Sequence, residues 1–334
     1  MGLDHDRFRE MTEPFRRELL AYCYRMVGSL HDAEDLVQDV FIKAWGGIDG
    51  FRGDSALRSW LYRIATNACI DALRRRPRRV LPSDVSAPAD PHDPVRPDVR
   101  EPIWLEPFPD TLLDESEDPE ARLCQRESVS LAFIAAIQHL TARQRAVLIL
   151  RDVLGWSAAE VAAALATTVA SVNSLLQRAR TVLRQRLPGP GASNTPSVVT
   201  QEQRVLLERY LRAWHAADID GLVVLLTEDA VMTMPPTPSW YRGREALAAF
   251  FTSTLRAGPL AGRLRLVPTR ANRQVGAAVY VVNPQTEIGD PFALKVLTIE
   301  SGLVSAITGF VMPELFSRFG LPATLAPSGL AVTS

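Results

Sequence analysis

One predicted helix carries a polar face with a single bulky apolar residue embedded in it. The members of this acidic face are Asp35, Gln38, Asp39 and Ile42. Their spacing of i, i+3, i+4 and i+7 places them side by side. A neighbouring stripe from Ala33 to Trp45 is apolar and is expected to be buried. Solvated faces rarely include an isoleucine, so the acidic face is a candidate for docking on a basic partner helix. The alternative is an ordinary amphipathic helix with a stray isoleucine.

A second predicted helix, from about Ala56 to Arg76, combines arginine, asparagine and an aromatic residue on one face. That face consists of Trp60, Arg63, Asn67, Asp71 and Arg74. Arginine neutralises phosphates, aromatic rings stack on unpaired bases, and asparagine both donates and accepts at a base edge. These residue types predict a nucleic-acid contact. The alternative is a solvated, arginine-rich helix with Trp60 in the core.

A third candidate surface lies on a predicted helix-turn-helix. Ser157 and Glu160 form an S-x-x-E capping box that begins a short helix, and Thr168 is the expected N-cap of the next helix, which ends near Leu187. The outer face of the second helix carries Ser171, Ser174, Gln177, Arg178 and Arg184. Small polar side chains approach base edges, and arginine reaches bases or phosphates. A plain helical hairpin is the alternative.

The elements that position these surfaces fall into three ordered blocks within the 334 residues. Two blocks, 8–76 and 120–187, have the apolar periodicity of helices. The third block, 200–322, is predicted to be α+β. A linker rich in proline and acidic residues occupies 77–119, and a flexible linker occupies 188–199. The first linker also contains Trp104 and Phe108, which a pure spacer does not need, so part of it is expected to dock on a folded domain.

The third block is expected to begin with a helix over Glu202–Ala217 and to continue with strands. The strand candidates are Arg263–Thr269, Ala277–Val282, Ala293–Ile299 and Val304–Phe310. Each is short, rich in β-branched residues, and bounded by Gly, Pro or Asn. We expect one or two helices packed on a curved antiparallel sheet.

Composition narrows the class of protein. The net charge of −1 hides a strongly basic stretch at 52–79 and an acidic one at 84–120, which favours a nucleic-acid surface next to an acidic linker. Cys23, Cys69 and Cys124 form no C-x-x-C pair, so neither a disulfide framework nor a zinc site is expected, and we predict no metal or cofactor. No apolar run reaches the roughly 20 residues that cross a bilayer, and no signal peptide is evident. We expect a cytoplasmic protein.

In this order, Asp32–Trp45, Phe51–Arg76 and Leu140–Leu187 resemble regions two and four of the extracytoplasmic-function (ECF) sigma factors of the sigma-70 family. These are bacterial subunits that direct RNA polymerase to promoters. The resemblance covers about the first 187 residues and implies two all-α domains, a region 2 bundle and a region 4 helix-turn-helix. It also implies that the acidic face binds the clamp helices of the polymerase β′ subunit, with the β flap as a further contact.

The same resemblance implies two sets of DNA contacts. The residues matched to the −10 promoter element are Phe51, Arg52, Trp60, Arg63, Asn67 and Arg74. The residues matched to the −35 element are Asn173, Ser174, Gln177 and Arg178. The acidic linker matches a connector that threads toward the polymerase active centre. Two departures stand out: Ala166 replaces the usual turn glycine, and Leu175 replaces a basic residue found in many relatives.

The third block resembles the SnoaL-like, NTF2-like fold, an α+β cone of helices on a curved sheet around a pocket. The likeness rests on residues 216–222, 229–236 and 240–246, and the 104–110 linker motif is most similar to the sigma-G type of ECF factor, with the sigma-J type second. The candidate pocket residues are Trp214, His215, Asp229, Met234, Trp240, Tyr241 and Arg242.

The sequence therefore predicts a non-enzymatic sigma factor of ECF type whose C-terminal domain regulates it in cis. A small-molecule ligand of that domain and a separate anti-sigma factor stay open at this point. Two other functions also stay open. One is a helix-turn-helix activator with a ligand-sensing domain, and the other is a SnoaL-like enzyme fused to a DNA-binding segment.

Overall fold

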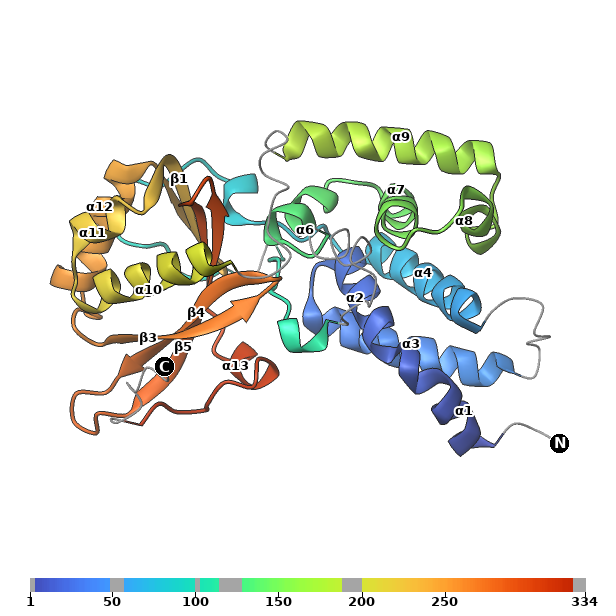
Figure 1. Cartoon of the computed structure of the whole chain (residues 1–334), viewed down its shortest axis with the longest axis horizontal. Coiled ribbons are helices and arrows are strands. Elements are labelled where there is room, and N and C mark those ends of the chain that lie inside the picture. Colours follow the sequence, from blue (N-terminus) through green and yellow to red (C-terminus); the bar gives the residue numbers. More distant parts are fainter. Residues whose placement is uncertain (1–3, 49–56, 100–102, 114–127, 188–199, 327–334) are drawn as a thin grey trace. The chain divides into compact units, whose positions relative to one another are not determined.

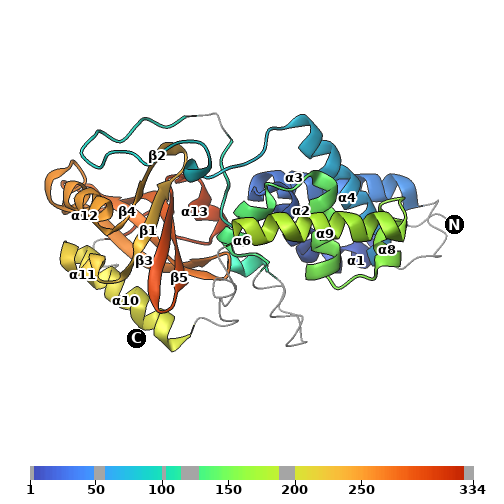
Figure 2. The same ribbon diagram turned by 90° about the horizontal axis from the view of Figure 1, so that it is seen from above.

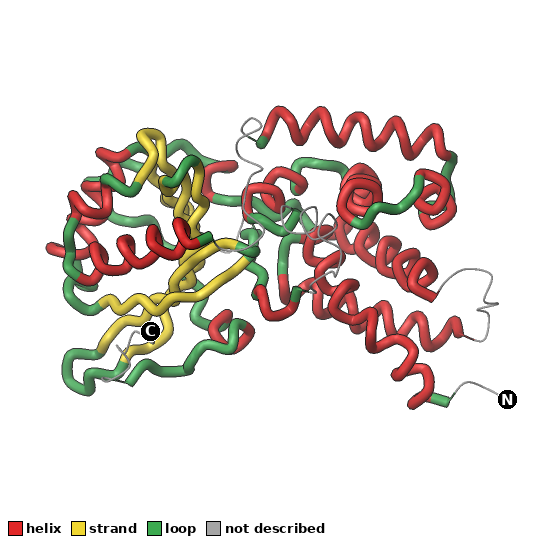
Figure 3. Tube along the Cα trace, viewed as in Figure 1, coloured by secondary structure: helices red, strands yellow, loops and turns green. Residues whose placement is uncertain are grey.

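The computed structural model describes residues 4–48, 57–99, 103–113, 128–187 and 200–326. The chain divides into two compact units (Figure 1). The first comprises Met1–Arg79, Leu105–Phe108 and Leu112–Ser193; the second comprises Val80–Trp104, Pro109–Thr111 and Asn194–Ser334. In Figure 3 the described part of the first unit consists of helices and loops, whereas the second contains the strands.

The N-terminal part of the first unit is a bundle of packed helices. Its elements are α1 (His5–Thr12), η1 (Glu13–Phe15), α2 (Arg16–Val27), α3 (Leu30–Gly47) and α4 (Leu57–Arg75). Aromatic side chains fill the space between them, with the Tyr22 hydroxyl and Thr66 Oγ1 2.7 Å apart inside the core. Helix α2 ends at Gly28, whose φ of +74° suits a residue without a Cβ. A Cβ there would also lie 2.8 Å from Leu105 Cδ1.

The C-terminal part of the first unit contains the helix-turn-helix. Its elements are α6 (Leu131–Ile137), α7 (Ala142–Leu148), η5 (Ile149–Val153), α8 (Ala158–Ala164) and α9 (Val169–Arg186). The predicted caps are present: Ser157 and Glu160 form the capping box of α8, and the Thr168 hydroxyl accepts a hydrogen bond from the Ser171 backbone N–H at 3.1 Å. The turn between α8 and α9 places Ala166 at φ +47°.

The two helical parts of the first unit share a core. Arg145 on α7 is buried and donates hydrogen bonds to the Met26 carbonyl at the end of α2 and to Gln138. The rings of Tyr62 and Trp156 meet edge to face with centroids 5.3 Å apart. The α2–α4 bundle and the helix-turn-helix therefore pack as one body in this structure.

The second unit contains a six-stranded sheet with helices packed on it (Figures 1 and 2). Its strands are β1 (Leu226–Met234), β2 (Thr237–Arg242), β3 (Leu264–Ala271), β4 (Gln274–Val282), β5 (Gly289–Glu300) and β6 (Leu303–Phe310), in the order β2-β1-β6-β5-β4-β3. Its helices are α10 (Gln201–His215), α11 (Ile219–Val223), α12 (Arg244–Thr252), η6 (Ser253–Ala257) and α13 (Leu315–Arg318). Helix α10 contacts β3 and β4, while α12 contacts β1 and β2.

The sheet corrects two expectations. It is not wholly antiparallel, because β1 pairs with β6 in parallel over Val231–Thr233. Strands β1 and β2 were also absent from the predicted strands. Glu228 and Asp229 are exposed near the start of β1 and obscure its β signal. A strand's direction and neighbours depend on long-range pairing, which side-chain alternation does not encode.

The first linker is largely part of the second unit. Its backbone follows strand β2, where the Ala89 N–H donates to the Trp240 carbonyl at 2.8 Å and the Arg96 N–H donates to Ser239 Oγ at 3.1 Å. Trp240 Nε1 donates to the Ser86 carbonyl at 2.9 Å. Two short helical turns, η3 (Pro82–Asp84) and η4 (Asp110–Leu112), interrupt the extended chain. Part of the linker docks as expected, and it covers the edge of the sheet.

The helices differ in length and apolar character, the two properties that membrane-spanning helices require. Over the described ranges, no single helix has both the length and the apolar character to cross a bilayer, although the bent pair α8 and α9 meets the criterion by length and composition alone.

Candidate functional site

The acidic face on α3 is fully presented to solvent. Asp35, Gln38 and Asp39 are exposed, and Ile42 has 61% of its surface accessible. On the opposite side Ala33, Leu36, Val37, Val40 and Ala44 are buried, as the periodicity predicts. Trp45 departs from the prediction, since it is 38% exposed at the end of the stripe and packs edge to face against Phe8. Helix α3 therefore packs one face into the core and exposes a face of acidic and aliphatic side chains to solvent.

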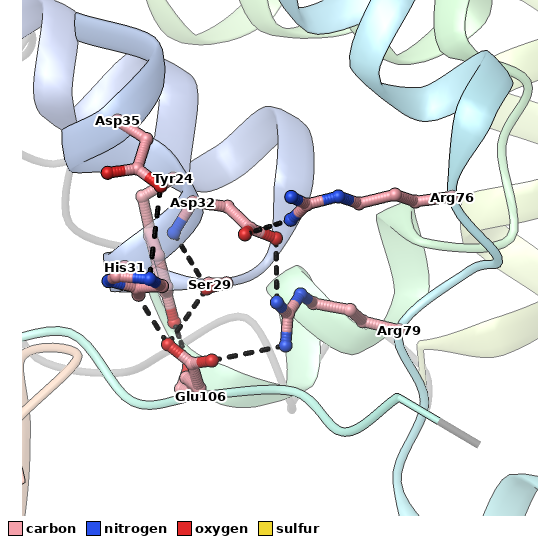
Figure 4. Close-up of polar contacts among 8 residues, drawn as sticks. All are labelled: Tyr24, Ser29, His31, Asp32, Asp35, Arg76, Arg79 and Glu106. Carbon is pink, nitrogen blue, oxygen red and sulfur yellow. Dashed lines mark hydrogen bonds and ion pairs between the residues drawn. The ribbon is translucent and has the colours of Figure 1, made fainter. Parts of the chain in front are cut away.

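The start of α3 is fixed by a buried ion-pair network (Figure 4). The Ser29 hydroxyl caps the helix by accepting from the Asp32 N–H at 3.0 Å. The Asp32 carboxylate pairs with Arg79 at 2.6 Å and with Arg76. Burial by itself would raise the pKa of Asp32, but the hydrogen bonds and charges of these two arginines hold it below its usual value. The network therefore ties the arginine-rich end of α4 to the first turn of α3.

Glu106 from the linker motif extends this network (Figure 4). One carboxylate oxygen accepts from Arg79 at 3.1 Å, and the other accepts from the Ser29 hydroxyl at 2.8 Å. The Glu106 backbone N–H donates to the Gly28 carbonyl at 3.0 Å, and Tyr24 donates to the Glu106 carbonyl. The flanking Leu105 and Phe108 are fully buried. The 105–108 segment is thus an integral part of the first unit, one helical turn from the acidic face.

The candidate −10 face on α4 is partly confirmed as a surface. Arg63, Asn67 and Arg74 are exposed, and Arg74 pairs with Asp71 at 3.2 Å. Trp60 is only 8% exposed, so the structure places its ring in the core and fits the alternative interpretation of that residue. Phe51 and Arg52 lie outside the described residues.

The candidate −35 face lies on α9. Asn173, Ser174, Gln177 and Arg178 are all exposed, while Val172, Leu176 and Ala179 are buried on the other side of the helix. Arg180 lies on a neighbouring face, where it forms a two-point pair with Asp152 at 2.9 and 2.7 Å. Leu175 is half-buried. The first half of α9 therefore presents a contiguous polar surface supported by a packed helix.

A cavity of about 440 Å³ lies inside the second unit. Trp214, Met234 and Phe250 contribute to an apolar wall, and one part of the wall is residues 95–98 of the linker. The Thr237 hydroxyl donates to Asp98 Oδ1 at 2.7 Å and holds that segment in place. This main cavity has the size of a small-molecule site.

The seven candidate pocket residues do not converge on one site. Trp214 and Met234 line the main cavity, whereas His215 borders a second cavity of about 360 Å³. His215 Nε2 accepts from the Leu266 N–H at 3.0 Å, and burial, with the charge of Arg265, lowers its pKa.

The remaining four candidates have other roles or positions. Tyr241 packs on Phe250 in the core, and Trp240 bonds to the linker. Asp229 and Arg242 are exposed. Within the described ranges, no group of three or more His, Cys, Asp or Glu side chains is arranged to hold a metal ion.

Lys295 is the functional candidate that sequence reasoning missed. It lines the main cavity from β5, is 5% exposed, and its Nζ has no hydrogen-bond partner among the described residues. Its nearest polarisable neighbour is the Trp214 ring, whose centroid lies 3.1 Å from Nζ. An ammonium gains about 2 kcal/mol from a desolvated ring face but loses several kcal/mol on burial. Burial therefore lowers the pKa of Lys295 well below its ordinary value. The available signal was a lysine inside an apolar strand, in a chain where only Lys43 and Lys295 of 37 basic residues are lysines.

Comparisons with known proteins match this architecture part by part. Family models match Sigma-70 region 2 at residues 11–79, Sigma-70, region 4 at 130–183, and the SnoaL-like domain at 207–294. Over 320 residues the chain is 48% identical to the ECF RNA polymerase sigma factor SigG of Mycobacterium tuberculosis (strain H37Rv), covering 95% of this chain and 85% of that protein. The chain is an ECF sigma factor.

Other relatives of this ECF sigma factor cover less of it or share the fold alone. The RNA polymerase sigma-H factor of Pseudomonas aeruginosa is 32% identical over 184 residues, which is 55% of this chain and 88% of that protein. The crystal structure of the Mycobacterium tuberculosis factor SigJ aligns with a TM-score of 0.59 at 22% identity, over 94% of this chain and 99% of that one.

The family and fold class inferred from the sequence are thus confirmed. As an ECF sigma factor, the protein acts with core RNA polymerase and promoter DNA. That membership decides against the alternative of a stand-alone helix-turn-helix activator.

Proposed function

We propose that this ECF sigma factor binds core polymerase through the acidic face of α3 and that its SnoaL-like domain regulates promoter use in cis. The acidic face meets the clamp helices of the β′ subunit. The composition of this face supports the role, because the exposed side chains of Asp35, Gln38 and Asp39 lie beside the exposed Ile42. Acidic groups attract and orient a basic helix, and the apolar side chain gains affinity when it is covered.

Promoter reading follows from two exposed helix faces. On α4, Arg63, Asn67 and Arg74 contact the −10 element, and on α9 the contacts to the −35 element come from Asn173, Ser174, Gln177 and Arg178. Arginine and the amide side chains form bidentate pairs with bases in the major groove. Exposure of all these side chains and their support by buried neighbours favour this assignment.

The observation that carries the regulatory part is the placement of the first linker. Residues 80–104 connect the two DNA-reading regions along the chain, yet they belong to the unit built around the SnoaL-like sheet. Hydrogen bonds from Arg96, Thr237 and Trp240 hold them there. A connector held by the third domain is not free to thread into polymerase, so this domain controls when the connector is available.

The SnoaL-like domain acts without catalysis in this proposal. General acid–base work needs a carboxylate or histidine inside a pocket. Asp229 is exposed instead, and the accepting nitrogen of His215 is engaged by a backbone N–H. Asp98 does line the main cavity, where its carboxylate accepts from the Thr237 hydroxyl. These three placements support a regulatory domain over an enzyme.

Run-off transcription with core polymerase tests the proposal. The full chain is compared with a form truncated after Pro190 and with the double variant Thr237→Val/Trp240→Phe. The double variant removes two donors to the linker while it keeps a branched side chain at 237 and an aromatic ring at 240, so it should release the connector and change transcript yield in the same direction as the truncation. An unchanged yield at unchanged core affinity in both forms would contradict regulation in cis. Transcripts that do not depend on core polymerase would contradict the sigma-factor assignment.

A further inference from the structure

Lys295 combines three properties that seldom occur together. It lies in the wall of the main cavity, its Nζ is buried without a hydrogen-bond partner among the described residues, and an aromatic ring covers it. No ion pair involves Lys295 among the described residues, although that part of the chain holds many others. An unpartnered amine in a cavity wall is available to interact with a ligand that enters the cavity.

The choice of lysine is itself informative. The chain uses arginine at nearly every basic position and lysine only at 43 and 295. Arginine stays protonated in proteins, whereas a buried lysine loses its proton readily and then carries a nucleophilic lone pair. Burial lowers the pKa of Lys295 well below its ordinary value, which agrees with this use.

The side chains that line the cavity around Lys295 indicate the chemical character of its ligand. Met232, Met234, Phe250 and Val279 line most of it and are apolar, while the charged Arg96 and Asp98 lie on its linker side. Such walls favour an aliphatic or aromatic body over a sugar or a phosphate. The lysine is therefore positioned to meet one polar group at the end of a hydrophobic molecule.

We propose that the main cavity binds a small apolar aldehyde or ketone and that Lys295 holds it as an imine. This inference deepens the proposed function, because it names the ligand class for the domain that regulates the sigma factor. It rests on the geometry of the cavity and on the unpartnered amine within it.

The reaction balances without any further reagent. The Nζ lone pair attacks the carbonyl carbon, and the new N–C bond becomes a C=N double bond. The C–O bonds break, and the oxygen leaves as water together with the two protons of the amine. The product carries no charge, so it suits an apolar cavity better than an ammonium does. Hydrolysis by water reverses the step when the carbonyl compound is withdrawn.

The cavity wall connects ligand binding to the connector. Residues 95–98 of the first linker close one part of the wall, and Asp98 is held there by Thr237. A ligand that fills the cavity meets these linker residues directly. Occupancy therefore changes how firmly the linker is held, which is the regulated step in the proposed function.

Reductive trapping with hexanal tests the site. The folded full chain is incubated with hexanal and cyanoborohydride near pH 7, and the alkylated residues are identified by peptide mass spectrometry. We expect Lys295 to be alkylated at least tenfold faster than the exposed Lys43, although Lys43 is far easier to reach. An aldehyde-bearing dextran, too large for the cavity, should reverse this order.

Two variants make the outcome unambiguous. In Lys43→Arg the chain has one lysine left, so a second alkylation beyond the N-terminal amine must be at Lys295. In Lys295→Met that alkylation disappears while the length of the side chain is kept. Failure to label Lys295 in the folded chain, with efficient labelling after unfolding in urea, would overturn the proposal, and so would equal labelling by the dextran aldehyde.

The trapping result is independent of transcription. If hexanal labels Lys295 selectively but run-off yield is unaffected by the adduct, the ligand site stands and its coupling to the linker fails. If Lys295 is not labelled but releasing the linker still changes run-off yield, the regulatory role stands and the carbonyl site fails.

Discussion

At the scale of single residues, this protein uses charge in two opposite ways. Asp35 and Asp39 are exposed, so they remain hydrated and attract a basic partner at little cost to the fold. Lys295 is buried without a counter-ion among the described residues, so the fold gives up stability to keep an amine there. Our proposals assign the first arrangement to a polymerase surface and the second to a ligand site.

The acidic face makes the first prediction. The double substitution Asp35→Ala/Asp39→Ala should raise the Kd for core polymerase about tenfold, equivalent to about 1.4 kcal/mol, mainly by slowing association. Fluorescence anisotropy of a labelled sigma factor titrated with core polymerase measures the change. Asp6→Ala/Glu10→Ala removes two exposed acids on α1, away from the acidic face, and should leave the Kd unaltered. Equal losses in both variants would show that only net charge matters.

Lys295 makes a prediction about stability. At pH 7, Lys295→Met should raise the free energy of unfolding by about 1–3 kcal/mol, because it removes a buried polar group that has no hydrogen-bond partner among the described residues. Between the lowered folded pKa and the ordinary value of 10.5, the unfolded state binds more protons, so wild-type stability rises with pH. The advantage of the variant should therefore shrink toward pH 10.5 in urea titrations. A constant advantage across this range would mean that the folded amine stays protonated.

At the scale of elements, the turn of the helix-turn-helix carries strain at one residue. Ala166 adopts φ +47°, a left-handed conformation in which its Cβ crowds the following carbonyl. The flanking caps from Ser157, Glu160 and Thr168 are all formed, so the turn is held from both sides. The sequence departure from glycine therefore lowers stability locally without changing the fold of the motif.

Replacing this alanine with glycine makes the third prediction. Ala166→Gly should raise the free energy of unfolding by about 1 kcal/mol, because glycine adopts positive φ without a steric cost. Ala163→Gly, at an exposed position inside α8, is the matched control and should lower it by about 1 kcal/mol. Thermal unfolding measures the change in unfolding free energy for each variant, and we expect an increase for Ala166→Gly and a decrease for Ala163→Gly. If both variants lost a similar amount of unfolding free energy, the turn at Ala166 would not be strained.

The linker motif shows how a short element can belong to a folded domain without regular secondary structure. Residues 105–108 contribute two fully buried apolar side chains and the Glu106 carboxylate to the first unit. The adjoining Pro109–Thr111 belongs to the second unit, where the Asp110 carboxylate accepts from the Arg273 N–H at 2.7 Å. Consecutive residues are therefore committed to different units by their side chains.

At the scale of the whole molecule, the first unit holds both DNA-reading helices in one packed body. Arg145 and the Tyr62–Trp156 pair connect the region 2 bundle to the region 4 helices. The −10 and −35 elements are separated by about 25 base pairs, roughly 85 Å of B-form DNA at 3.4 Å per step. Helices that share a core cannot reach both elements together, so the proposed promoter contacts require the packed body to open, and we expect this opening when core polymerase binds.

Opening of the first unit is the fourth prediction. Fluorophores placed at Asp71 on α4 and Arg184 on α9 should show lower energy transfer after core polymerase is added, since the two helices separate. Labels are introduced as unnatural amino acids, which avoids the native cysteines. A second pair at Arg17 and Asp71 lies within the bundle and should keep its transfer efficiency. A drop in both pairs would indicate general loosening, and no drop in the first would exclude opening.

Local chemistry made much of this protein predictable. The capping residues, the apolar periods and the strand-forming runs were sufficient to place the helix-turn-helix, α3, α4 and four of the six strands, since each signal lies within a few residues of the element it forms. The exposed polar faces on α3 and α9 followed from the same periods. Trp60 and Trp45 were misplaced because a period gives the direction of a side chain and not what covers it.

The amino-acid sequence by itself determined the family and the order of the domains, and it predicted the faces that we propose for polymerase and promoter. Tertiary structure alone decided the parallel pairing of β1 with β6, the attachment of linker residues to different units, and the burial of Lys295 in the wall of a cavity. The physical reason is the separation along the chain of the residues that each interaction joins. Hydrogen bonds and apolar periods within one helix or strand are local, whereas burial, a missing counter-ion and a shifted pKa come from segments far apart in the chain.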